Sequence, residues 1–209
     1  MAHRRKPLAA ALALNTAVLV AEIAGGVSAG SLSLITDGIH NLSDEAALAL
    51  LLLAYWLHTG LSGRFLRLAN LFNSIGLLTV CGFVIWHVVE RLARPVAVIG
   101  WIPVIAGLFG AMGNWGVAYV LRAHARHDPS IRLAYVHNLG DTLLSLAPVA
   151  AGILVIVFQR SFFDPLVALM IAGFILVTSV SSLAGSHREL LWPDDVVCGH
   201  PEDAAAQSN

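Results

Sequence analysis

Long apolar stretches, interrupted by short polar or charged separators, dominate the chain. A helix needs about 20 mostly apolar residues to cross the hydrocarbon layer of a bilayer. The separators carry glycine, proline or charged residues, which are typical of turns between helices. The pattern therefore predicts an all-α membrane protein with six spans, at approximately 8–28, 33–57, 68–91, 98–121, 132–158 and 164–185.

Composition supports this interpretation. The chain is 57% hydrophobic and 12% charged, with a mean hydropathy of +0.77, whereas a soluble domain has about 45–50% apolar and about 25% charged residues. A net charge of −1 argues against a nucleic-acid partner, which requires clustered basic charge. The basic start resembles a signal peptide, but its apolar run is longer and contains Asn15 and Glu22, so we expect a retained first span.

Basic residues predict the orientation of the spans. By the positive-inside rule, loops rich in lysine and arginine face the cytoplasm. One side of the predicted membrane carries Arg4, Arg5, Lys6, Arg64, Arg67, Arg122, Arg126, Arg132 and Arg188, and the other only Arg91, Arg94 and Arg160. We therefore expect both termini in the cytoplasm, with the chain in the cell (inner) membrane.

Two copies of a His-x-x-x-Asp pattern lie inside the apolar segments, His40 with Asp44 and His137 with Asp141. A spacing of four brings each pair onto one face of a helix. Ionisable groups at membrane depth are costly and usually mark an ion or substrate pathway. Two neutral imidazoles and two carboxylates carry a charge of −2, which matches a divalent cation. The structural alternative is a pair of His–Asp hydrogen bonds between packed helices.

Further polar residues share the spans with this pattern. Asn15 and Glu22 lie seven residues apart and therefore on one helical stripe, and Asn114 lies in the fourth span. Asp37 precedes His40 by one turn, toward the external end. We expect these four residues to support the metal ligands or to line an ion path, with Asp37 either on the access path or structural.

The ligand chemistry favours zinc. Tetrahedral coordination by nitrogen and oxygen suits Zn²⁺, whereas Ca²⁺ takes six to eight oxygen ligands. Affinity order alone leaves Cd²⁺, Co²⁺ and Ni²⁺ possible. Metal binding requires deprotonated ligands, so metal and protons compete for one site, and histidine exchanges protons in the physiological range. The sequence therefore predicts a proton-coupled antiporter, not an enzyme, with zinc as transported substrate and no prosthetic cofactor.

Two other classes of function remain open. An intramembrane zinc enzyme would need an open coordination position and a general base beside the metal, and the sequence contains no His-Glu-x-x-His motif. A non-transporting metal sensor or assembly partner is the third hypothesis. It is less favoured because little of the chain lies beyond the predicted membrane segments.

The chain resembles the cation diffusion facilitator family, which exports zinc and other divalent metals. The resemblance runs through residues 8–192 and rests on Asn15, Glu22 and Gly25-Gly26, then on SLSLITDGIHNLSD, HNLGD, ERLARP and DPLVALMIAGFIL. It implies a six-helix transmembrane bundle, a homodimer, and transport by alternating access driven by protons. It also implies that His40, Asp44, His137 and Asp141 are the ligands, and a histidine at position 40 resembles zinc-preferring members.

One departure from the family pattern concerns the end of the chain. Most relatives continue into a soluble cytoplasmic domain of ferredoxin-like fold, which binds metal and tightens the dimer. Here we expect a transmembrane domain over 1–192 and a short, disordered cytoplasmic tail over 193–209. The chain is then either a naturally short member or a truncated one, and dimerisation would rely on membrane helices.

Overall fold

The computed structural model describes residues 2–57, 63–126 and 129–185 of the chain. Within these ranges the regular structure is entirely helical. The helices are α1 (Ala2–Ala29), α2 (Leu32–Leu57), α3 (Gly63–Ala93), α4 (Trp101–Leu121), α5 (Pro129–Leu144), α6 (Leu146–Phe158) and α7 (Phe163–Gly185). The predicted tail over 193–209 lies outside the described residues, so the boundary at residue 192 stays a prediction.

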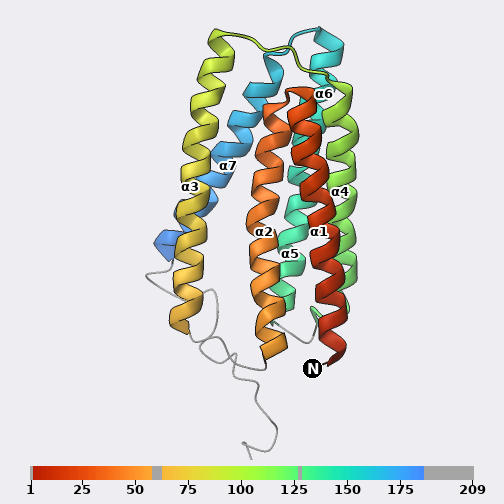
Figure 1. Cartoon of the computed structure of the whole chain (residues 1–209), viewed down its shortest axis with the longest axis vertical. Helices are drawn as coiled ribbons and strands as arrows, with labels where there is room; N and C mark the ends of the chain where they lie inside the picture. Colours follow the sequence, from red (N-terminus) through yellow and green to blue (C-terminus); the bar gives the residue numbers. More distant parts are fainter. Residues whose placement is uncertain (1, 58–62, 127–128, 186–209) are drawn as a thin grey trace, which may run out of the picture.

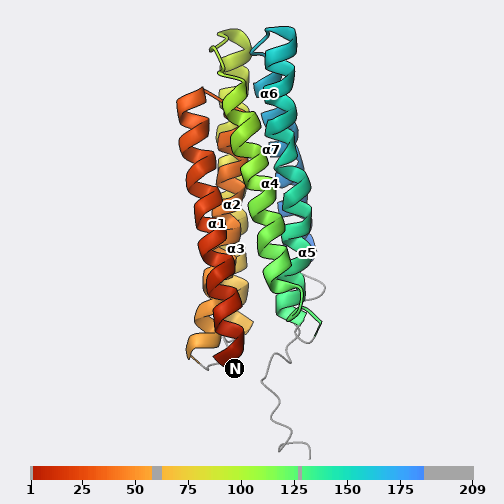
Figure 2. The ribbon, with the colours of Figure 1, turned by 90° about the vertical axis from the view of Figure 1, so that its right-hand side faces the viewer.

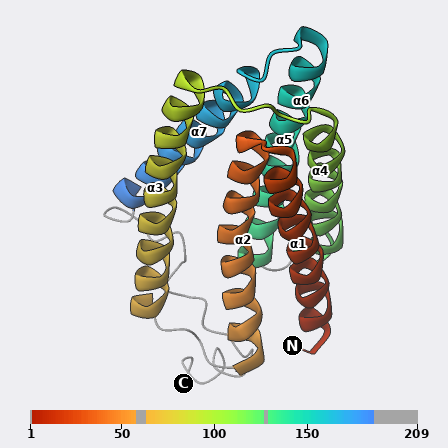
Figure 3. The same cartoon turned by 45° about the horizontal axis from the view of Figure 1, so that its top comes forward.

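The helices lie along the long axis of the molecule and alternate in direction, except that α6 continues in the direction of α5 (Figure 1). α1 packs against α2 and α4, and α4 also packs against α5 and α6. α3 and α7 pack against each other at one side of this group (Figures 1 and 3). The view turned by 90° shows the helices lying nearly parallel (Figure 2). The predicted all-α bundle is confirmed.

Five helical segments of the described residues are long and apolar enough to cross a membrane: 6–29, 75–93, 101–121, 134–158 and 163–181. α2 is the sixth helix of the predicted set and is less apolar, because it carries Asp37, Asp44 and Glu45. It nevertheless runs alongside the other helices for most of its length (Figure 1). Its neighbours therefore shield polar groups that an isolated span would expose to lipid.

Within the predicted span over 132–158, the structure forms two consecutive helices, α5 and α6, which meet at Ser145. Pro148 explains the division. Proline has no backbone N–H for the carbonyl of Leu144, and its ring clashes with that carbonyl in a regular helix. The N–H of Ser145 still donates to the carbonyl of Asp141 at 2.9 Å, so α5 stays helical up to the break.

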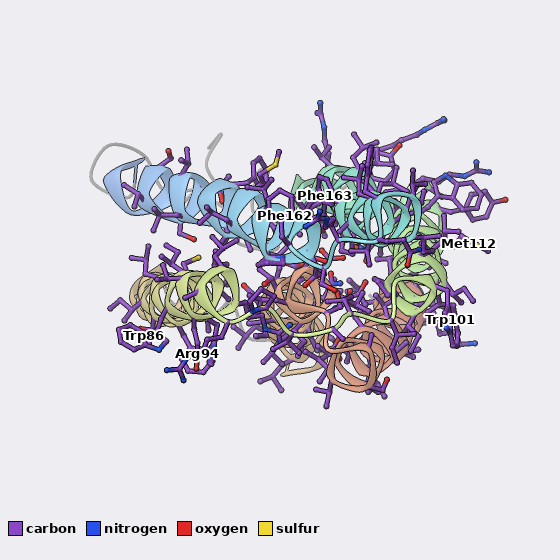
Figure 4. All side chains as sticks on the ribbon, turned by 90° about the horizontal axis from the view of Figure 1, so that it is seen from above. Trp86, Arg94, Trp101, Met112, Phe162 and Phe163 are labelled. Carbon is purple, nitrogen blue, oxygen red and sulfur yellow. The ribbon has the colours of Figure 1, made fainter. Side chains whose placement is uncertain are left out.

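Apolar residues line both the outside and two separate cores. Trp86 and Met112 are 69% and 71% exposed and point away from the helices (Figure 4), as lipid-facing residues do. One core joins α3 and α7 with parts of α2 and α6. The other joins α1, α2, α4 and α5 near the N-terminal end of α1, and its fully buried members include Leu8, Val117 and Ile131.

A buried carboxylate fixes the N-terminal end of α2. Asp164, in the first turn of α7, is fully buried and accepts from Ser31 Oγ, Leu32 N and Ser33 Oγ, each at 2.6 Å. A carboxylate at a helix N-terminus satisfies free N–H groups and interacts favourably with the helix dipole. The preceding turn requires Gly30, whose φ of 65° most side chains avoid.

We expect Asp164→Ala to destabilise the protein, because three buried donors would lose their acceptor. Hydrogen bonds to charged groups contribute about 1.5–3 kcal/mol each, so the loss of three implies a total of at least about 4.5 kcal/mol. Thermal unfolding in detergent, followed by tryptophan fluorescence, measures the effect. Ser28→Ala is the control, since the bonds of this exposed hydroxyl to the described part of the chain go to carbonyls of its own helix. Equal midpoints for the two variants would contradict the prediction.

Candidate metal centre

Four side chains from two helices meet in the interior of the bundle. α2 supplies His40 and Asp44, and α5 supplies His137 and Asp141. One ligand atom of each residue lies within 4.8 Å of those of the other three. The spacing of four places each pair on one helix face, and the tertiary structure turns the two faces toward each other.

The contacts between the four side chains cross from one helix to the other. His137 Nε2 lies 2.7 Å from Asp44 Oδ1, and His40 Nε2 lies 3.4 Å from Asp141 Oδ1. Within the helices, His40 Nε2 and Asp44 Oδ2 are 4.0 Å apart, and His137 Nε2 and Asp141 Oδ2 are 3.6 Å apart. Each imidazole therefore directs Nε2 toward both carboxylates, as ligands converging on one ion would.

Burial differs among the four residues. His40, Asp44 and Asp141 are 7%, 5% and 5% exposed, whereas the side chain of His137 is 48% exposed. α5 packs mainly on α4, and it meets α2 through these polar side chains and through the apolar core that contains Leu48 and Ile131. The two α2 residues of the cluster are therefore buried, and the cluster is exposed at the His137 side chain.

The electrostatics of the cluster favour a cation. Its ion pairs, among the described residues, are between histidine and aspartate, with no lysine or arginine. Asp44 Oδ2 and Asp141 Oδ2 are buried and have no hydrogen-bond partner among the described residues. With neutral imidazoles the charge is −2. Two nitrogens and two carboxylate oxygens form a donor set that suits tetrahedral Zn²⁺.

Asn15 lies apart from the four-residue cluster and links α1 to α2. Its Nδ2 donates to the carbonyl of Asn41 at 3.1 Å and to Glu45 Oε2 at 3.0 Å. Thr16 donates its hydroxyl to Glu45 Oε1 at 2.5 Å. These bonds explain why α1 carries polar residues on the stripe that faces α2.

The other predicted supporting residues form a second polar layer beside the cluster. Glu22 is fully buried and its Oε2 accepts from Asn41 Nδ2 at 2.5 Å. Asp37, 1% exposed, lies within hydrogen-bonding reach of Glu22 and of Ser145. Asn114 Nδ2 donates to Ser145 Oγ at 3.2 Å. None of these residues belongs to the four-residue cluster.

The sequence did not predict three of the polar residues that bond to these supporting side chains: Asn41, Glu45 and Ser145. Glu45 had a usable signal, because an acidic residue within a predicted span is costly unless it has partners. Asn41 follows His40 directly, and nothing in the sequence distinguishes its amide from the rest of the SLSLITDGIHNLSD motif. Ser145 had no signal of its own, because its position depends on the break between α5 and α6.

Comparison with known proteins identifies the family. The sequence model of the cation efflux transmembrane domain matches residues 8–191. The chain belongs to the cation efflux family. Together with its apolar helices, this membership makes it a multi-pass membrane protein.

Several curated relatives are similar over most of the chain. It is 31% identical to the zinc transporter ZitB of Pectobacterium atrosepticum, over 89% of this chain and 61% of the relative. It is 30% identical to the cadmium, cobalt and zinc/H(+)-K(+) antiporter of Bacillus subtilis, over 82% and 58%. The metal cation efflux system protein CzcD of Cupriavidus metallidurans is 29% identical over 91% and 64%. The chain thus spans about three-fifths of the length of these relatives.

The second polar layer depends on a close approach of α1 to α4 at Gly110. A Cβ atom at this position would lie 2.0 Å from Glu22 Oε1. We therefore expect Gly110→Ala to displace the Glu22 carboxyl and lower the thermal midpoint in detergent. Gly173→Ala is the matched control, since a Cβ there meets nothing within 4 Å; helix propensity alone favours alanine by about 1 kcal/mol. A thermal midpoint raised equally in both variants would contradict the close approach of Gly110 to Glu22.

Proposed function

We propose that this chain exports a divalent metal cation, zinc as the first candidate, in exchange for protons. The observation that carries the proposal is the convergence of His40, Asp44, His137 and Asp141, with ligand atoms within 4.8 Å of one another. Relatives that are 31% and 30% identical to the chain are named as a zinc transporter and as a cadmium, cobalt and zinc/H(+)-K(+) antiporter. Transport, not catalysis, is therefore the activity that we propose.

Exchange of metal for protons follows from the ligand chemistry. His137 Nε2 and Asp44 Oδ1, at 2.7 Å, are spaced for one proton between them. A metal ion needs the lone pairs of both atoms, so its arrival displaces that proton. His40 and Asp141 form a longer contact of the same kind, at 3.4 Å. Protons that return to these pairs would release the metal.

Access from one side at a time would make this exchange productive. Three of the four side chains are buried and the fourth, His137, is half exposed. α5 begins at the membrane side that carries the N-terminus of α1 (Figure 1), which we propose to be cytoplasmic. In this arrangement the cytoplasmic metal would reach His137 first. Movement of α2 and α5 against their neighbours would then open the site to the other side.

The assembly and its location are part of the same proposal. We propose a homodimer in the cell (inner) membrane with both termini in the cytoplasm. The clustering of basic residues at one side of the spans supports this orientation. Glu22, Asp37, Asn15 and Asn114 would support the ligands or line the ion path, and Cd²⁺, Co²⁺ and Ni²⁺ are alternative substrates.

Removal of one ligand from each helix tests the site. We expect Asp44→Ala and His137→Ala to lower zinc affinity by at least about 100-fold, because even partners of metal ligands contribute about 10–100-fold. Zinc uptake into proteoliposomes under an imposed pH gradient, read by an internal zinc dye, measures the effect. Glu90→Gln is the control, since its side chain is 55% exposed on α3. Unchanged uptake by both ligand variants would refute the site.

Metal selectivity gives a separate test of His40. Replacement of its imidazole by a carboxylate, in His40→Asp, should favour a larger ion that accepts more oxygen ligands. We expect cadmium uptake to rise relative to zinc uptake when both are measured in the same vesicles. An unchanged zinc-to-cadmium ratio would mean that His40 does not contact the transported ion.

A further inference from the structure

Two carboxyl groups outside the four-residue cluster lie together in the interior of the bundle. Glu22 comes from α1 and is 0% exposed, and Asp37 comes from α2 and is 1% exposed. The two groups lie within hydrogen-bonding reach of each other. We refer to them as the Glu22–Asp37 pair.

The hydrogen bonds of the pair are incomplete. Glu22 Oε2 accepts from Asn41 Nδ2, but Glu22 Oε1 has no partner among the described residues, and neither has Asp37 Oδ2. An ionised carboxylate can only accept hydrogen bonds. Two ionised groups therefore cannot bond to each other, whereas a single proton would supply the donor between them.

The charges around the pair do not compensate it. His40 and Asp44 face it from α2, and Asp141 faces it from α5. α4 contributes the uncharged Gly110 and Asn114, and Ser145 lies between α5 and α6. His40 is the one group of this set able to carry positive charge, and its Nε2 is directed to Asp141.

Burial makes two negative charges at this position costly. An uncompensated ion in an apolar interior is several kcal/mol less stable than in water, so such groups are paired or neutralised. Two carboxyl groups that share one site commonly hold one proton between them.

The packing favours a proton over a metal ion as the bound species. A Cβ atom at Gly110 would lie 2.0 Å from Glu22 Oε1, and one at Gly38 would lie 3.2 Å from Glu22 Cβ. Backbone thus closes on the Glu22 side chain from α4 and from α2. A shared proton needs no additional volume, whereas even a small metal ion needs a coordination shell.

We propose that Glu22 binds a proton that it shares with Asp37, and that this proton exchanges during transport at a site separate from the metal ligands. The role in transport rests on the proposed function, whereas the bound proton does not. The pair and the metal ligands share the α2 helix, so a movement of α2 that releases metal would also alter the distance between Glu22 and Asp37.

Infrared spectroscopy of the full chain in lipid vesicles tests the bound proton without transport. At neutral pH we expect the carbonyl stretching band of a protonated carboxylic acid, shifted in D₂O, and we expect Glu22→Gln to lose it. The glutamine N–H can donate to Asp37 in place of the shared proton, so this variant should fold. Glu90→Gln is the control, because this 55% exposed side chain of α3 lies outside the buried pair, so its replacement should leave the band unchanged.

Proton movement per zinc ion tests the role in transport. Zinc and pH dyes in the same proteoliposomes should show that Glu22→Gln transports zinc with fewer protons and with a weaker dependence on pH than the parent. Zinc affinity of the variant, measured by calorimetry, should fall less than that of Asp44→Ala, because the four ligands are intact.

The possible results separate the claims. Absence of the acid band in the parent, or an unchanged band in Glu22→Gln, would overturn the proton site. A lost band with unchanged proton movement per zinc would overturn its role in transport. If the parent moves no divalent metal under any gradient, the proposed function fails, and the infrared result still decides whether Glu22 holds a proton.

Discussion

The burial of carboxylate groups among apolar helices is the constraint on which the rest of this structure depends. Glu22, Asp37, Asp44, Asp141 and Asp164 are all at most 5% exposed, and such groups are unstable in an apolar interior without compensation. The molecule compensates them in different ways. Asp164 receives hydrogen bonds from the start of α2, and Asp44 and Asp141 face histidines. For Glu22 and Asp37 we have proposed a shared proton.

These different solutions divide the bundle into functional and structural parts. The Asp164 contacts join α7 to the N-terminal end of α2 through two hydroxyls and a backbone N–H, which suits a fixed point. The four-residue cluster, in contrast, leaves Asp44 Oδ2 and Asp141 Oδ2 without partners and leaves His137 half exposed. A site that exchanges its ligand cannot be fully satisfied by the protein, because the incoming ion must improve on the contacts that it replaces. α2 carries both kinds of contact and therefore links them.

The arrangement of the helices also separates the apolar outer surface from the polar side chains of the interior. α3 and α7 pack through an apolar core that has few polar members, whereas α1, α2, α4 and α5 enclose the polar layer. An apolar core near the N-terminal end of α1 lies below that layer. Such a core would hinder ions that do not pass through the metal ligands. The membership of the cation efflux family fits a bundle in which one group of helices encloses the proposed metal site and the other packs beside it.

The sequence by itself determined the helices and the ligand pairs, because both depend on short-range periodicity. Apolar runs of membrane length predicted the six spans, and a spacing of four placed His40 with Asp44 and His137 with Asp141 on single helix faces. The break at Ser145 could have been expected from Pro148. Only the tertiary structure decided that the two faces meet, that Asn15 pairs with Glu45, and that Glu22 lies against Asp37. Those contacts join residues that are distant in sequence, and their positions depend on how whole helices pack, which no local pattern encodes.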